Sequence, residues 1–160
     1  MTTEAKFRGL LEAWKNDKTI IIVCWFDETF RNLSAFLTTA TNESVPLFTP
    51  REVQSVFLQG KQIIFAEHYP LWQKENDFFS KLGLSTVSIF SSLDEPLLSR
   101  FGGEKIDLLL KKMGMSPTTP IEHIMISKAI KSAQQKISKK IVYEQPANSA
   151  ADWMTRNYSS

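Results

Sequence analysis

The apolar run Thr19–Phe26 constrains the fold of this chain more than any other segment. It consists almost entirely of β-branched and aromatic residues, without alternation of apolar and polar side chains. Both faces of such a strand must be covered, which is typical of a central strand in a parallel sheet. The run is far too short to cross a bilayer as a helix, so it predicts an inner strand rather than a membrane segment.

Helices are predicted on both sides of this strand. The apolar residues before it recur at the i, i+3, i+4, i+7 spacing of an amphipathic helix: Phe7, Leu10, Leu11 and Trp14. After the strand, apolar residues of the segment 30–37 share one helical face. Asp27 stands just before that segment, where we expect it to cap the helix.

The middle of the chain carries further strands and helices. The segment 49–52, Thr-Pro-Arg-Glu, has the capping-box arrangement with proline at the first helical position, and we expect its helix to end at Gly60. Apolar runs at 62–66 and 86–90 are predicted strands, and the residues 71–82 between them have helical spacing until Gly83. Alternating strands and helices favour right-handed βαβ units, so we predict an α/β fold: a parallel sheet of about four strands with helices on both faces.

The last part of the chain is predicted to be helical, with helices over 104–113 and 121–141. The second helix follows another capping box, Thr-Pro-Ile-Glu at 119–122. Its apolar stripe consists of Ile126, Ile130, Ala133, Ile137 and Ile141. We therefore divide the chain into an α/β part, residues 1–115, and a helical extension, residues 116–160, packed on the same core within a single structural domain.

The helix over 121–141 also has a basic face outside its apolar stripe: Lys128, Lys131, Lys136, Lys139 and Lys140. Such a face can bind an acidic protein, nucleic acid or an anionic membrane surface, and solvent exposure alone explains it equally well. The net charge is only +2 and no aromatic residues interleave these lysines, so nucleic acid is an unfavourable partner. Trp153 in the polar tail is a candidate anchor, either within the chain or for a partner.

The cysteine and histidine content argues against metal chemistry. The single Cys24 cannot form an internal disulfide, and with 2 histidines there is no set to close a structural zinc site, so we expect no metal ligands. The first residues lack the apolar run of a signal peptide. We therefore expect a cytoplasmic protein that does not span the membrane.

Five polar residues follow the predicted strands and are candidates for a ligand crevice: Asp27, Glu67, His68, Ser92 and Asp94. The carboxyl ends of parallel strands meet at one edge of the sheet, where α/β proteins bind their ligands. Asp and Ser at such turns also cap helices, and capping is the stronger explanation.

An ordered series of short motifs follows residue 86. The motifs are Ser92-Leu93-Asp94-Glu95, Phe101-Gly102-Gly103-Glu104-Lys105-Ile106, Met113-Gly114-Met115, Pro120-Ile121-Glu122-His123 and Lys128-Ala129-Ile130. In this order they resemble the end of the second nucleotide-binding domain of the preprotein translocase ATPase SecA and the start of its long scaffold helix. Residues 7–37 resemble the opening helix, strand and helix of the same domain more weakly, and residues 63–68 its penultimate strand.

The resemblance implies a RecA/helicase-like half and partners in the Sec system, but this chain departs from the family where ATP is handled. That family hydrolyses ATP between two such domains, and this chain matches only one. It contains no G-x-x-x-x-G-K-[ST] loop. Between residues 38 and 86 it has only Gly60, Gly83 and Arg51 to set against the family's glycine-rich loop and arginine-rich motif. The chain looks like a shortened, degenerate half of the motor.

These features together predict a non-catalytic SecA-like protein without a cofactor, which works as a protein-interaction module related to preprotein translocation. The alternative is a small-ligand or nucleotide-binding protein, including a hydrolase, that uses the crevice at the carboxyl ends of the strands. Inheritance of a fold does not by itself fix the function, so the site must decide between the two.

Overall fold

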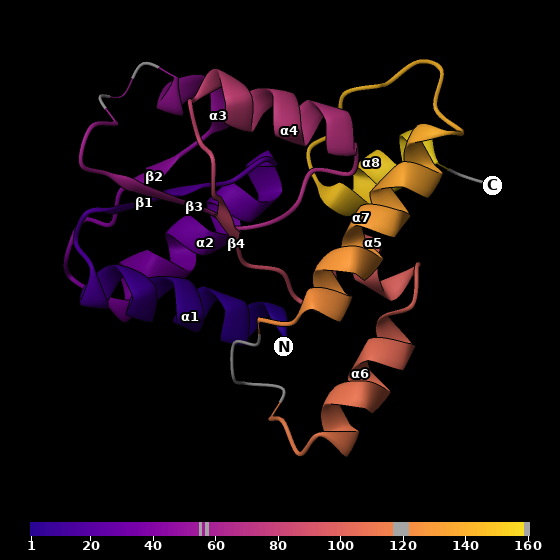
Figure 1. Cartoon of the computed structure of the whole chain (residues 1–160). Helices are drawn as coiled ribbons and strands as arrows, with labels where there is room; N and C mark the ends of the chain where they lie inside the picture. The colour runs from indigo at the N-terminus through magenta and orange to yellow at the C-terminus, as the bar shows by residue number, and fades with distance from the viewer. Residues whose placement is uncertain (55, 57, 117–121, 159–160) are drawn as a thin grey trace.

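A computed structural model describes residues 1–54, 56, 58–116 and 122–158 of the chain. Its central sheet is made of β1 (Ile20–Val23), β2 (Leu47–Phe48), β3 (Gln62–Phe65) and β4 (Ser88–Ile89). The strands are all parallel and lie in the order β2-β1-β3-β4 (Figure 1). Every residue of β1 is buried and the strand has a neighbour on each side, which confirms the prediction of an inner strand.

Helices cover both faces of this sheet, as predicted. α1 (Thr3–Asn16) and α2 (Asp27–Ala40) pack on one face, and α3 (Pro50–Val53) and α4 (Trp72–Lys81) pack on the other. Successive side chains of a strand point to opposite faces, so Ile20 and Ile22 of β1 join the first apolar cluster and Ile21 and Val23 join the second. The fold is therefore of the α/β class.

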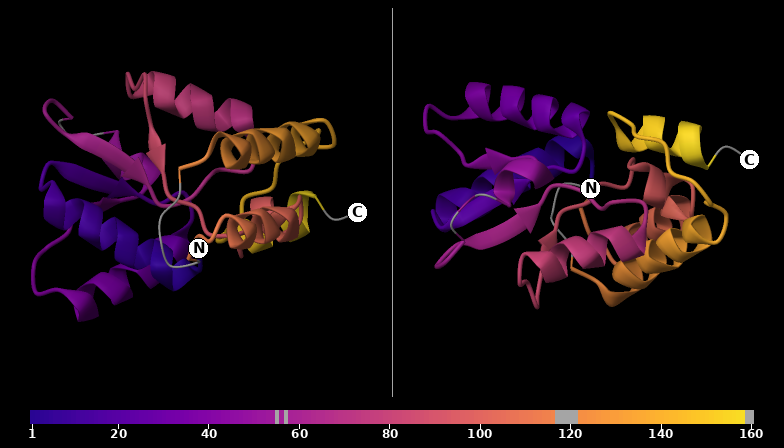
Figure 2. Two further views of the ribbon diagram at one scale, coloured as in Figure 1. Left: turned by 60° about the horizontal axis from the view of Figure 1, so that its bottom comes forward. Right: turned by 90° about the horizontal axis from the view of Figure 1, so that it is seen from above.

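A further group of helices packs beyond the carboxyl ends of the strands (Figure 2). It consists of α5 (Pro96–Ser99), α6 (Gly103–Lys112), α7 (Ile124–Ser138) and α8 (Ala150–Asn157). Ile130 and Ile137 of α7 are buried in an apolar cluster with Trp153 of α8, and Phe26 joins that cluster from the sheet side. The apolar stripe predicted for α7 is thus the side that packs against the rest of the chain.

Three helix boundaries differ from the prediction, and one helix was not predicted. α7 ends at Ser138, three residues before the predicted end at 141. The capping box at Thr49 is present, but it begins a single turn that ends at Val53, because capping fixes only the first turn of a helix. α7 begins at Ile124 instead of 121, and its N-cap is His123, whose Nδ1 accepts a hydrogen bond from the Met125 N–H at 3.1 Å. Of the capping box expected at 119–122, the first three residues lie outside the described part of the chain. α5 was not predicted at all.

Candidate functional site

The topology places a switch point between β1 and β3. The chain leaves β1 through α2 toward β2 on one side, and leaves β3 through α4 toward β4 on the other. Ligands of α/β proteins bind at such points. Here aromatic packing fills much of the space, because the rings of Phe26 and Tyr69 stack with centroids 5.7 Å apart and Trp153 meets Tyr69 edge-on at 6.3 Å.

Glu67 lies at the switch point and has a structural role at the start of α2. Its side chain is 3% exposed, and it accepts hydrogen bonds from the Phe26 N–H at 3.0 Å and the Thr29 hydroxyl at 2.6 Å. Phe26 is the N-cap of α2, so Glu67 serves the helix end that Asp27 was expected to cap, and that expectation was wrong. Asp27 is instead an exposed residue of the first turn. Burial raises the pKa of Glu67 to about 7.

Ser92 and Asp94 tie the segment after β4 to α1. The Ser92 hydroxyl donates to Glu95 Oε1 at 3.2 Å, and the same carboxylate pairs with Lys6, whose side chain is almost fully buried. Asp94 accepts a hydrogen bond from the Thr3 hydroxyl at 2.8 Å. All of these polar groups are satisfied by neighbours within the chain, so Ser92 and Asp94 hold elements together.

His68 has a different setting, because its imidazole is held by a buried carboxylate. Its Nδ1 lies 2.9 Å from Oε1 of Glu75, which is itself 3% exposed. Glu75 also accepts hydrogen bonds from the Tyr69 N–H and from Nε2 of Gln134, each at 2.9 Å. The ring of His68 is therefore fixed in orientation, and Nε2 is the nitrogen left for another group.

One sequence feature indicates a buried polar contact at Glu75. Glu75 falls on the apolar stripe of its helix, where a carboxylate is unusual unless it has buried partners. No pattern pointed to Gln134, which reaches Glu75 from α7 across a separation of 59 residues.

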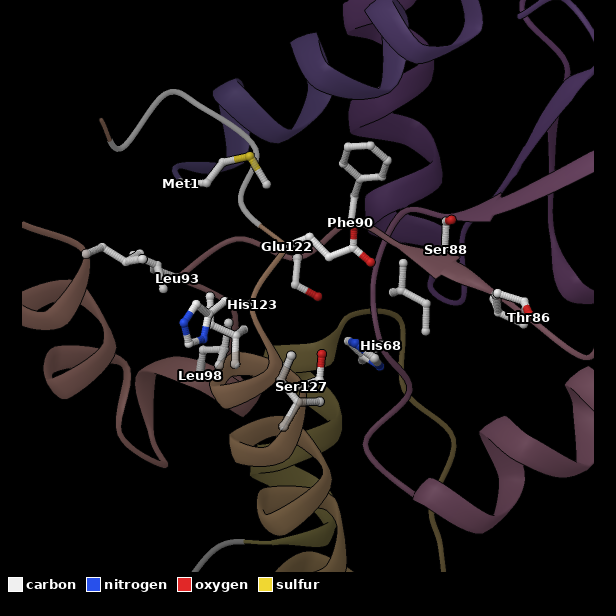
Figure 3. A pocket seen from close by; sticks show the side chains of 16 residues that line it. Met1, His68, Thr86, Ser88, Phe90, Leu93, Leu98, Glu122, His123 and Ser127 are labelled. Carbon is white, nitrogen blue, oxygen red and sulfur yellow. The ribbon is translucent and has the colours of Figure 1, made fainter. Parts of the chain in front are cut away.

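A cavity of about 520 Å³ lies between β4 and α7 beside His68 (Figure 3). Its walls include the consecutive residues 86–91 along β4, and Glu122, His123, Ile126, Ser127 and Ile130 at the start of α7. Of the candidate crevice residues, His68 alone lines this cavity. The hydroxyl of Ser91, another lining residue, is buried and has no hydrogen-bond partner among the described residues. Of the five predicted crevice residues, the structure thus places only His68 at this cavity.

A second hollow, of about 400 Å³, opens on the α4 side of the switch point. It is lined by the rings of Trp25, Tyr69 and Phe78 together with Lys74 and Lys81. The indole N–H of Trp25 is buried and has no partner within the described part of the chain. Lys74 is ion-paired with Glu144. This hollow therefore offers mainly aromatic faces to a partner group.

The basic face of α7 is exposed, as its position outside the apolar stripe predicts. Three of its lysines lie on α7 and two in the turn directly after it, and all five are at the surface: Lys128, Lys131, Lys136, Lys139 and Lys140. None of them forms an ion pair with a described residue, while the Nζ of Lys131 lies 5.1 Å from the Trp72 ring centroid and that of Lys140 lies 5.0 Å from the Tyr158 centroid. We call this set the lysine face.

Trp153 does not belong to that surface. Its side chain is 1% exposed, and its indole N–H donates to Glu144 Oε1 at 2.7 Å. Glu144 also accepts a hydrogen bond from the Tyr69 hydroxyl. Trp153 therefore serves as an anchor within the chain and not for a partner, because its ring is inaccessible from outside.

The described residues give little support for a reactive thiol, a metal site or a membrane-spanning helix. Cys24 is buried, and burial raises the pKa of its thiol far above the usual value, which disfavours a reactive thiolate. The described residues contain no group of three or more His, Cys, Asp or Glu side chains arranged to hold a metal ion. None of the helices in that part of the chain combines the length and apolar character needed to cross a bilayer.

Comparison with known proteins supports the resemblance to SecA. The chain is 32% identical over 84 residues to the protein translocase subunit SecA of Syntrophus aciditrophicus, and 34% identical over 92 residues to that of Gracilaria tenuistipitata var. liui. A shorter match, to SecA of Desulforapulum autotrophicum, is 44% identical over 48 residues. No protein-family model matches the sequence.

The matches cover limited parts of both proteins. The first two cover 50% and 54% of this chain, and 10% of the relative in each case. The third covers 30% of this chain and 6% of its relative. About half of the chain is thus related in sequence to SecA, and the chain spans about a tenth of the length of these relatives.

Proposed function

We propose that this protein takes part in preprotein translocation by binding another protein through the lysine face of α7. The observation that carries the proposal is the lysine face itself: five exposed lysines along α7 and the turn directly after it, none ion-paired with a described residue, in a chain related to SecA. The opposite side of α7 is buried, so the helix presents these charges from a fixed position.

The chemistry of this face favours an acidic protein surface as its partner. Charge complementarity speeds association and orients partners, while charges at the rim of an interface are sensitive to salt. The names of the relatives suggest a component of the Sec translocation system, and a cytoplasmic location goes with that role.

A non-catalytic role is part of the proposal. The sequence lacks the phosphate-binding loop of P-loop enzymes, and the switch point is occupied by Glu67 and by the stacked rings of Phe26 and Tyr69. Four of the five crevice candidates do not line the cavity beside His68. Glu67, Ser92 and Asp94 form hydrogen bonds with other parts of the chain, and Asp27 is exposed at the surface. Binding of a small ligand at that cavity remains the second candidate function, because His68 is oriented there by Glu75.

The experiment is an affinity capture of the tagged protein from its native host's lysate with mild crosslinking, followed by mass spectrometry. The informative variant is the triple reversal Lys136→Glu, Lys139→Glu and Lys140→Glu. Its matched control reverses three exposed lysines elsewhere, Lys61, Lys81 and Lys112, and so carries the same net charge. Recovery of Sec translocation proteins that is lost only in the lysine-face variant supports the proposal. Equal loss in both variants indicates a non-specific charge effect and contradicts it.

A further inference from the structure

We propose that the open edge of β4, together with the cavity beside it, binds an extended basic segment of a partner protein as an added β-strand. This inference rests on the proposed function as an interaction protein and names the kind of segment bound. It concerns a different surface from the lysine face, so the two proposals are separately testable.

β4 has a hydrogen-bonding edge that faces away from the sheet. β4 is the last strand of the sheet and pairs only with β3 among the described residues. The Phe90 N–H donates to the Phe65 carbonyl at 2.9 Å, so residues 88 and 90 face β3. In a parallel strand the backbone groups of alternate residues point to opposite sides. Val87, Ile89 and Ser91 therefore direct their N–H and C=O groups away from β3, which is the arrangement that accepts a further strand.

The cavity runs along this edge of β4. Six consecutive residues, 86–91, line it. Because successive side chains of a strand point to opposite faces, a cavity that meets all six must follow the strand's edge. α7 forms another wall of the cavity, and Figure 3 shows Ser127, His68 and Ser88 among the side chains around it. The volume of about 520 Å³ is within the range of ligand-binding clefts.

The chemistry of the cavity walls selects the occupant. Leu98, Ile126 and Ile130 give apolar contacts. Within the described ranges the cavity lining has no lysine or arginine side chain, and Glu122 is its one carboxylate. Met1 also lines it, but burial lowers the pKa of its α-amino group and so weakens its positive charge. Phosphate and carboxylate ligands are therefore disfavoured, and a positive side chain is favoured. An extended peptide with alternating apolar and basic residues satisfies the edge, the apolar wall and Glu122 together.

Two polar groups at the cavity support a hydrogen-bonding occupant. The Ser91 hydroxyl is buried without a partner among the described residues, and an unsatisfied buried hydroxyl is costly. The His68 ring is fixed through its Nδ1 by Glu75, which leaves Nε2 for a donor on the occupant. The Ser91 hydroxyl has no hydrogen bond among the described residues that would account for its position, and the Nε2 of His68 takes no part in the pair with Glu75.

The test uses two blocked hexapeptides, Ac-Lys-Val-Lys-Val-Lys-Val-NH2 and its counterpart with glutamate in place of lysine. A third probe is the lysine peptide with alternate backbone nitrogens methylated, which keeps the side chains but removes donors to the β4 edge. Each is titrated into the isotope-labelled full chain, with amide shifts followed by NMR. We expect saturable shifts at Val87, Ile89 and Ser91 with the lysine peptide, and at least about tenfold weaker binding of the other two probes.

The matched variants are Glu122→Gln and Glu104→Gln, both at exposed positions where folding is not at risk. Glu122→Gln is expected to weaken the lysine peptide about threefold to tenfold, and Glu104→Gln to leave it unchanged. Three outcomes overturn the inference: no saturable binding of the lysine peptide, equal binding of the methylated probe, or shifts confined to other surfaces.

The triple reversal of the lysine face separates this proposal from the proposed function. It leaves the β4 edge intact, so binding of the lysine peptide is expected to change by less than about twofold at physiological salt. If the native chain does not bind the lysine peptide but still captures Sec proteins, only the strand-addition proposal is contradicted. Retained peptide binding with no capture contradicts only the proposed function.

Discussion

His68 Nδ1 and Glu75 Oε1 lie 2.9 Å apart, and the second oxygen of Glu75 accepts a hydrogen bond from Gln134 on α7. One buried carboxylate thus joins the end of the β3 segment, α4 and the helix that carries the lysine face. Removal of such an acceptor leaves several donors without partners in a low-dielectric interior. The position of α7, and with it the lysine face and one wall of the β4 cavity, depends on this group.

We predict that Glu75→Ala lowers the free energy of unfolding by about 3 kcal/mol or more, because the His68, Tyr69 and Gln134 donors all lose their acceptor. Urea unfolding measures the change. Glu12→Ala is the control, since Glu12 is exposed and forms only a surface pair with Lys15, and its cost is about 0.5 kcal/mol or less. A similar small cost for both variants would show that Glu75 does not join these elements.

Glu67 is predicted to make stability depend on pH. Its pKa is raised by burial from 4.5 to about 7 in the folded chain, so the folded state retains a proton that the unfolded state loses. The contribution of Glu67 is therefore fully present below about pH 4.5 and is lost as the pH rises through 7, with a maximum of about 3 kcal/mol.

The measurement is urea unfolding of the native chain and of Glu67→Gln at about pH 5 and about pH 8. Glutamine cannot ionise, so the comparison isolates this one carboxyl group from all others that titrate. The stability advantage of the native chain over the variant is expected to be larger at the lower pH. An advantage that grows with pH would mean that Glu67 is bound as a carboxylate throughout.

Trp153→Ala is predicted to destabilise the fold by about 3–5 kcal/mol, because the side chain is 1% exposed and its removal leaves a large void. Trp153→Phe keeps most of the ring but loses the hydrogen bond to Glu144, so a smaller cost is expected. Thermal unfolding of both variants gives the comparison. An unchanged melting temperature for Trp153→Ala would place α8 outside the folded core.

The fold class was predictable because local patterns and tertiary packing agree in this chain. The unalternating run at β1 requires cover on both faces, and the apolar spacings of α1, α2 and α4 supply it. Boundaries were less predictable, since the capping signal at Thr49 starts a helix without setting its length. The short helix α5 has too few residues to show a periodic pattern.

The candidate site was predictable only in part, because its decisive contacts are long-range. Asp27 has the residue type and position of an N-cap, yet a carboxylate 41 residues from Phe26 in sequence reaches the start of α2. His68 was identified from its position after a strand, whereas Gln134 and the cavity along β4 depend on how α7 packs. No single-sequence pattern encodes that packing.

The non-catalytic part of the account predicts that Mg-ATP and Mg-ADP do not bind saturably in calorimetry. The physical reasons are the missing phosphate loop and the filled switch point between β1 and β3. Saturable nucleotide binding that is lost in His68→Ala or Asp94→Ala would instead favour the small-ligand alternative at the carboxyl ends of the strands.

The most direct test of the central claim is the amount of Sec translocation proteins that crosslink to the native chain and to its variants, quantified by mass spectrometry. The account predicts at least about tenfold lower recovery with Lys136, Lys139 and Lys140 reversed to glutamate, and unchanged recovery with Lys61, Lys81 and Lys112 reversed. Equal recovery by the native chain and the lysine-face variant would contradict the claim that this face makes the contact.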